Sequence, residues 1–149
     1  MRQPKPLVVA NWKMNGDLDL VQQMSDALSL LTQPLPDILI CPPVIFLPHF
    51  PKHLNYKLGA QNMSEQLAGA FTGEISADML RAAGASHVII GHSERRALYG
   101  ELDVVISQKI KVAVEAGLTP ILCVGETQQQ REEEKTLQVL ARQLDAVYA

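Results

Sequence analysis

The chain has 149 residues, of which 47% are hydrophobic and 19% charged, a composition typical of a globular protein that can bury a core. A formal charge of −3 without a run of basic residues excludes a general attraction to nucleic acid or anionic membranes, so a phosphate would need a local binding site. No apolar stretch approaches the roughly 18 residues of a membrane-spanning helix, and no signal peptide is recognisable, so we expect a cytoplasmic protein without a membrane partner.

Apolar runs predict five strands, at residues 7–10, 38–41, 57–62, 87–90 and 120–124. Between them, helical spacing and capping residues predict helices. Their markers are Asp17 with Val21, Met24, Leu28 and Leu31; Ser76 before 77–83; Ser93 as a cap; and Leu102, Ile106, Ile110 and Val114 on one face. Residues 44–54 carry Pro48 and Pro51, so any helix there is short or broken. A last helix is expected with Glu132, Glu133 and Glu134 near its start and an apolar stripe at Leu137, Leu140, Leu144 and Val147.

The order is therefore strand then helix, five times, and the strands are continuous apolar runs. Such runs are typical of a parallel sheet covered by helices. Right-handed crossovers leave two architectures, an open doubly wound sheet or part of a (βα)8 barrel. Because no linker or internal repeat interrupts the chain, we expect a single domain over residues 1–149.

Polar residues follow the predicted strands at Asn11, Lys13, Gln61, Asn62, His92, Glu94 and Glu126. A parallel sheet brings these strand ends to one edge. There Lys13 and His92 suit an oxyanion, since an ammonium group stabilises negative charge and an imidazole donates a hydrogen bond. If Ser93 caps the following helix, the positive end of that helix disfavours protonation of His92, which can then donate while neutral.

The remaining reactive side chains indicate no metal or cofactor. Cys41 and Cys123 lie in or beside apolar strands and are expected to be reduced, although a bridge is not excluded by sequence. His49 and His53 have a spacing that could ligate a metal, but Pro51 lies between them and no acidic partner is near. Walker, dinucleotide-binding and serine-nucleophile motifs are absent from the sequence.

Five segments resemble the triosephosphate isomerase family, in its order and spacing: residues 11–16, 58–62, 69–74, 89–96 and 117–127. The resemblance implies interconversion of dihydroxyacetone phosphate and glyceraldehyde 3-phosphate in glycolysis and gluconeogenesis, without a cofactor. It implies that Lys13 is the catalytic cation, that Asn11 binds substrate beside it, and that Glu94 supports Lys13. His92 would be the electrophile, and the family's established mechanism uses a neutral imidazole at a helix N-terminus. The loop with Phe71 and Thr72 resembles the one that docks into a second subunit, which implies a homo-oligomer.

The chain also departs from the family. A (βα)8 barrel needs about 250 residues and eight strands, whereas five units are recognisable here, so we expect a partial barrel that this chain does not close. The family's general base, a glutamate on the sixth strand, and the glycine-rich phosphate loops have no counterpart. We therefore expect little or no activity from these residues alone, and association through the open edges at 7–10 and 121–124. Two alternatives are a non-catalytic half-barrel that self-associates and a different phosphosugar enzyme on an open sheet.

Overall fold

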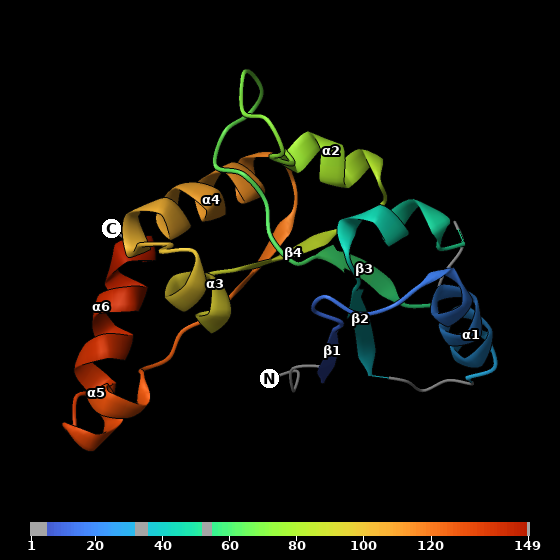
Figure 1. Ribbon diagram of the computed structural model, residues 1–149. Coiled ribbons are helices and arrows are strands. Elements are labelled where there is room, and N and C mark those ends of the chain that lie inside the picture. The colour runs from blue at the N-terminus through green and yellow to red at the C-terminus, as the bar shows by residue number, and fades with distance from the viewer. Residues whose placement is uncertain (1–5, 32–35, 52–54, 149) are drawn as a thin grey trace, which may run out of the picture.

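The computed structural model describes residues 6–31, 36–51 and 55–148, and its centre is a curled parallel sheet of five strands in sequential order (Figure 1). The strands are β1 (Leu7–Asn11), β2 (Asp37–Cys41), β3 (Lys57–Ala60), β4 (His87–Ile90) and β5 (Thr119–Leu122). Each crossover leads to the next strand along the sheet. Within the described residues, β1 and β5 each pair with a single strand, so the sheet is an open half of a (βα)8 barrel.

Helices connect the strands, and several of them pack against the outer face of the sheet (Figure 1). They are α1 (Leu18–Ser29), the 3-10 helix η1 (Val44–His49), α2 (Ala77–Ala82), α3 (Ser93–Leu98), α4 (Asp103–Glu115), α5 (Gln128–Glu132) and α6 (Thr136–Tyr148). The predicted caps of α1 and α2 are confirmed. Asp17 accepts a hydrogen bond from the Leu20 amide at 2.8 Å, and Ser76 accepts one from the Met79 amide at 3.3 Å.

The two faces of the sheet carry different cores because successive side chains of a strand point to opposite faces. On the outer face, Ile40, Leu58, Val88 and Ile90 belong to the large core beneath the helices. The inner face carries a small cluster of Leu39, Cys41 and Ile89, with Ile121 and Cys123 against it. Both cysteines are free thiols, as expected. None of the helices in the described part of the chain is long and apolar enough to cross a membrane.

Two predicted strands are too long at their ends. β3 stops at Ala60, because Gln61 turns its side chain back to backbone carbonyl groups, and β5 runs over 119–122 rather than 120–124. The expected last helix is also divided. The α5 helix ends at Glu132, and Glu133 is its C-cap. Glu134 has a left-handed φ of 57°, which interrupts the helical backbone, so the three glutamates do not lie at the start of α6.

The predicted apolar stripes of the last two long helices are partly wrong. In α6, Leu137 is 81% exposed and Leu144 38% exposed, while Val139 and Gln143 are the buried positions. Gln143 is buried because its amide group bonds both the N–H of Gly125, at 2.8 Å, and its carbonyl group, at 3.1 Å. The buried face of α6 is therefore set by the hydrogen bonds of Gln143 and not by the leucines.

In α4 the predicted face is wrong at both ends, since Leu102 and Val114 are exposed. The buried positions are Ile106, Lys109 and Ala113. Lys109 can occupy this buried face because its ammonium group pairs with the carboxylate of Glu101, which is also buried.

Candidate functional site

The ends of β1, β3 and β4 meet at a cavity of about 770 Å³. The polar side chains in its lining include six of the seven residues that follow strands in the sequence: Asn11, Lys13, Gln61, Asn62, His92 and Glu94. The seventh, Glu126, is not among the lining residues and instead accepts a hydrogen bond from the Thr136 hydroxyl at 3.3 Å. The structure thus brings together the predicted candidates from three separate strands.

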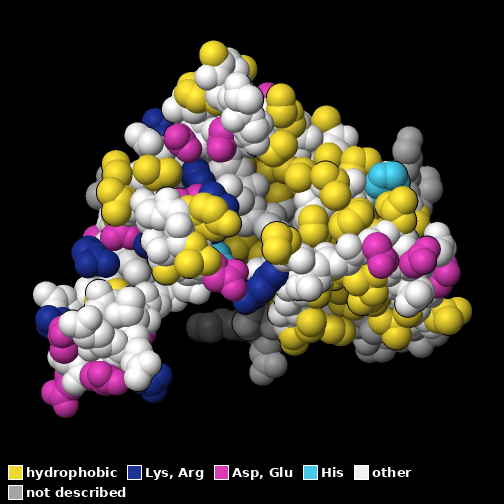
Figure 2. All heavy atoms as spheres, viewed as in Figure 1, with side chains coloured by type: hydrophobic (Ala, Val, Ile, Leu, Met, Phe, Trp, Pro, Cys, Tyr) yellow, Lys and Arg dark blue, Asp and Glu magenta, His cyan; other side chains and the backbone are white. Residues whose placement is uncertain are grey.

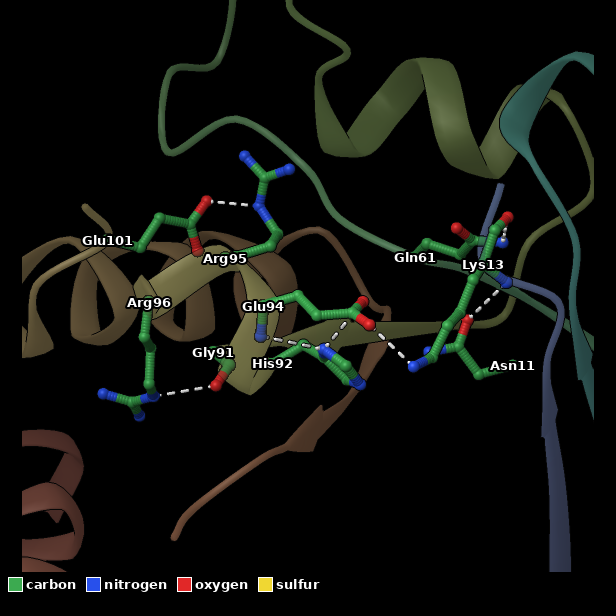
Figure 3. A network of polar contacts seen from close by, with 9 residues as sticks. All are labelled: Asn11, Lys13, Gln61, Gly91, His92, Glu94, Arg95, Arg96 and Glu101. Carbon is green, nitrogen blue, oxygen red and sulfur yellow. Dashed lines mark hydrogen bonds and ion pairs between the residues drawn. The ribbon is translucent and has the colours of Figure 1, made fainter. Parts of the chain in front are cut away.

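Lys13 is held in an unusual backbone conformation at the mouth of the cavity. Its φ of 54° lies in the left-handed region, which costs a non-glycine residue about 1–3 kcal/mol. Two side chains hold it there. Asn11 Oδ1 accepts the Lys13 N–H at 3.0 Å, and Gln61 Nε2 donates to the Lys13 carbonyl oxygen at 2.9 Å and to that of Cys41 at 2.8 Å (Figure 3). The turn that positions Lys13 is therefore fixed by the last residue of its own strand, β1, and by the residue that follows β3.

The Lys13 ammonium group reaches across the cavity to Glu94. Its Nζ lies 2.6 Å from Glu94 Oε1, and the two side chains are 52% and 47% exposed (Figure 3). The hydrogen bond from Lys13 lowers the pKa of Glu94, desolvation opposes the shift, and the positive charge of Lys13 adds to it. Glu94 is therefore an ionised carboxylate that already has a cationic partner.

His92 caps α3 with its own side chain. Nδ1 accepts the Glu94 N–H at 3.3 Å, while Glu94 Oε2 lies 3.4 Å from the same nitrogen. The first contact requires an unprotonated Nδ1 that accepts a hydrogen bond, whereas the second requires a protonated Nδ1 that donates one. The N–H contact has the geometry of an N-cap bond and the carboxylate contact rests on distance alone, so we take Nδ1 as the acceptor. The ring is then neutral, with its proton on Nε2.

The expectation that Ser93 caps this helix is wrong. Ser93 is the first residue of α3 and is exposed, and the residue before it provides the cap. An imidazole nitrogen two residues before the Glu94 amide can accept its hydrogen bond as a serine oxygen would.

Two lining residues, Asn62 and Arg95, join the cavity to a buried ion pair of Glu101 and Lys109, which the sequence did not single out as part of the site. Glu101 Oε1 accepts hydrogen bonds from Arg95 Nε and Lys109 Nζ, both at 2.6 Å. Lys109 also donates to Asn62 Oδ1 at 2.9 Å. The available signal was a lysine between Ile106 and Ile110 on an apolar helical face, where a charge needs a buried partner.

The predicted oligomer residues, Phe71 and Thr72, are not part of the cavity lining, although their loop reaches the cavity directly after them, at Gly73 and Glu74. Phe71, 45% exposed, and Thr72 belong to the loop that projects from the body of the molecule between β3 and α2 (Figure 1). His49 is exposed and His53 lies outside the described residues; no group of three potential metal ligands occurs in the part that the structure describes.

A curled parallel sheet with a lysine, a histidine and amide side chains at the carboxyl ends of its strands defines the class: half of a (βα)8 barrel with a site suited to an anion. The sequence model of the triosephosphate isomerase family matches residues 6–149. The chain is 47% identical over 147 residues to a triosephosphate isomerase of Alkalilimnicola ehrlichii and 50% identical over 144 residues to one of Alcanivorax borkumensis. The chain belongs to the triosephosphate isomerase family.

These alignments cover 96% and 95% of the chain but 59% and 58% of the relatives. A crystal structure of triosephosphate isomerase from Bartonella henselae superposes with a TM-score of 0.91 at 41% identity, covering 97% of this chain and 62% of that one. The chain thus spans about three fifths of the length of the proteins it resembles.

Proposed function

We propose that this chain supplies the electrophilic part of an active site that interconverts dihydroxyacetone phosphate and glyceraldehyde 3-phosphate. The observation that carries the proposal is the shared cavity: Asn11, Lys13 and His92 come from two strands and line one space. The Lys13 ammonium group would meet the negative charge of the substrate, with Asn11 beside it. Because such a group is fixed before the substrate arrives, it stabilises developing charge without reorganisation.

His92 would act through Nε2–H. A neutral imidazole with Nδ1 engaged by the Glu94 amide can donate to the carbonyl oxygen of the substrate. As negative charge develops on that oxygen, the enediolate forms, and the same ring can carry a proton between its two oxygens. No metal or cofactor is needed for these steps.

The proton on carbon requires a general base within hydrogen-bond reach. Two carboxylates, Glu74 and Glu94, line the cavity. Glu74 belongs to the loop between β3 and α2 and not to the end of a strand. Glu94 is paired with Lys13, which lowers its pKa and makes it a weaker base. Glu126 lies outside that lining. We therefore propose that residues 1–149 on their own turn over triose phosphates little or not at all, and that the base is supplied by polypeptide beyond them.

A fusion tests the proposal. Residues 1–149 are joined to the part of the Alkalilimnicola ehrlichii relative that they do not match, and the product is assayed for conversion of glyceraldehyde 3-phosphate. We expect activity that falls roughly 10²–10⁴-fold in His92→Gln and roughly 10²–10³-fold in Lys13→Met. His49→Gln, which alters an exposed histidine outside the cavity lining, is the matched control and should change nothing.

A folded but inactive fusion, or one in which both site variants remain active, would refute the proposed function. The unfused chain is assayed in parallel. Turnover by the unfused chain that disappears in His92→Ala would overturn the proposal that it is inactive alone.

We also propose that the chain self-associates. On the open edge, Leu7, Val8 and Val9 of β1 are 44%, 53% and 38% exposed, and unpaired edge strands of this kind recruit partners. Figure 2 shows further hydrophobic side chains on the surface of the viewed face. The projecting loop with Phe71 and Thr72 is a second contact. Light scattering at micromolar concentration tests this, and a monodisperse monomer would refute it.

A further inference from the structure

Arg96 joins three elements from outside the cavity. Its Nε donates to the carbonyl oxygen of Gly91 at 2.8 Å and its Nη2 to that of Cys123 at 3.2 Å, while Nη1 lies 2.5 Å from Asp103 Oδ1. The side chain is 17% exposed and is not part of the cavity lining. Arg96 therefore does not meet a ligand, yet it binds the backbone at the ends of β4 and β5.

The Gly91 contact bears on the imidazole of the site because Gly91 precedes His92. The Gly91 carbonyl oxygen and the His92 N–H belong to one planar peptide group. A fixed carbonyl oxygen therefore fixes the plane from which the His92 side chain departs. Figure 3 shows the Arg96 guanidinium bound to Gly91 on the side of the turn away from Lys13.

Gly91 and Arg96 are also matched in shape. Gly91 is buried with a φ of +75°, a conformation that favours glycine. A Cβ placed there would lie 3.0 Å from Arg96 Nη2 and 3.3 Å from the Cys123 oxygen. The absent side chain of Gly91 thus leaves the space that the guanidinium group occupies.

Asp103, in the first turn of α4, orients the guanidinium group. Its Oδ1 accepts from Arg96, and its Oδ2 accepts from Arg142 Nε of α6 at 3.2 Å. A guanidinium group offers donors in a rigid planar fork, which lets Arg96 bind two carbonyl oxygens and a carboxylate at once. A lysine at this position has one ammonium group and cannot reproduce that arrangement.

We propose that Arg96 is a positioning residue for His92: by tying the Gly91 carbonyl group to the end of β5, it sets the direction in which the imidazole enters the cavity and keeps Nδ1 on the Glu94 amide. The significance of that position rests on the proposed function. The effect of Arg96 on the orientation of His92, however, can be measured without turnover, so either proposal can fail while the other stands.

The test is nitrogen-15 NMR of the histidine rings in the 149-residue chain, comparing wild type with Arg96→Lys. Wild-type His92 should show a single neutral tautomer with the proton on Nε2. In Arg96→Lys its two nitrogen shifts should move toward those of exposed His49. The Glu94 amide should exchange about fivefold faster, as the loss of a hydrogen bond worth about 1 kcal/mol gives.

Two controls separate positioning from a general loss of structure. His87 is buried, with Nδ1 2.8 Å from the Ser86 hydroxyl, and its signals should not move in any folded variant. Arg142→Lys is the matched substitution, since Arg142 contacts the same aspartate but is 61% exposed. It should leave His92 unchanged.

A folded Arg96→Lys chain with wild-type His92 shifts overturns the proposal, as does a wild-type His92 that already exchanges between tautomers. If Arg96→Lys does not fold, Asp103→Asn decides: it retains the arginine but removes the charge that orients it. A smaller shift of His92 in the same direction supports the proposal, and an unchanged His92 overturns it.

Discussion

Replacing Lys109 by methionine should destabilise the chain by about 3 kcal/mol. Lys109 is 3% exposed, and its ammonium group makes a charged hydrogen bond to Glu101 and a second to Asn62, at 2.6 and 2.9 Å. Both hydrogen bonds come from a charged ammonium group, and a hydrogen bond that involves a charged group contributes about 1.5–3 kcal/mol. Breaking a buried ion pair costs about 3–5 kcal/mol. Methionine refills the volume and Arg95 still pairs with Glu101, so the lower end of that range applies.

Urea unfolding measures the effect, with Lys111→Met as the control. Lys111 lies on the same helix but is exposed, so the same substitution there should stay within about 0.5 kcal/mol of wild type. With a slope of about 2 kcal/mol per molar urea, Lys109→Met should lower the midpoint by about 1.5 M. A difference below about 1 kcal/mol between the two variants would refute the reasoning, since a buried pair could not then be worth what the contacts imply.

The same comparison has a pH dependence. Burial alone would raise the pKa of Glu101, but hydrogen bonds from Lys109 and Arg95 outweigh it and the pKa is lowered. A lowered folded-state pKa contributes stability above the ordinary glutamate value of about 4.3, and that stability is lost as the pH falls through the folded-state pKa. The gap between wild type and Lys109→Met should therefore be largest near neutral pH and shrink in acid. A gap that widens in acid would contradict the assignment.

Three further predictions concern the site and the inner face of the sheet. Lys13→Met should raise the pKa of Glu94 toward its ordinary value in a carbon-13 NMR titration; an unchanged pKa would mean that the hydrogen bond is absent in solution. Burial raises the pKa of Cys41 to about 12, and it also raises the pKa of the partly exposed Cys123, although the charge of Arg96 opposes that shift. At pH 8 iodoacetamide should therefore modify Cys123 first, and should reach Cys41 only when the chain unfolds. Equal rates of modification would contradict this. Gly59→Ala places a Cβ 2.7 Å from the Cys41 sulfur and should lower the free energy of unfolding in urea by about 1–3 kcal/mol. Part of that stability should return in the double variant with Cys41→Ala. If the two substitutions instead destabilise additively, the clash is excluded.

The local pattern of the sequence predicted a parallel sheet and the meeting of Lys13 with His92, while the choice of a half-barrel over an open sheet came from the family resemblance. Apolar runs set the strands, and parallel strands place their carboxyl ends at one edge. The half-barrel is confirmed by the sheet order and the structural match, and the two side chains do line one cavity. Their catalytic roles stay predictions.

What the sequence missed depends on contacts between distant side chains. Gln143 and Lys109 can be buried because each is hydrogen-bonded to a residue distant in sequence, Gly125 at 18 residues and Glu101 at 8 residues. Hydrophobic periodicity does not reveal such partners. The cap of α3 was misassigned to Ser93 for a related reason. Serine is a common capping residue, and only the position of the His92 ring in the structure shows that an imidazole caps this helix.

The pairing of Lys13 with Glu94 explains how a cation can be aimed at an open cavity before any ligand arrives. The Nζ–Oε1 contact of 2.6 Å restrains a flexible side chain, while exposure of both groups keeps the pair weak, since exposed ion pairs stabilise little. An ammonium group has three donors, so Lys13 can keep Glu94 and turn the others to an anionic ligand. If the carboxylate were absent, the lysine would sample many rotamers, and an incoming phosphate would have to order it. We therefore expect Glu94→Gln to weaken binding of inorganic phosphate to the active fusion at low salt, because the amide restrains Nζ less; tighter binding would show that charge repulsion by Glu94 outweighs its restraint of Lys13.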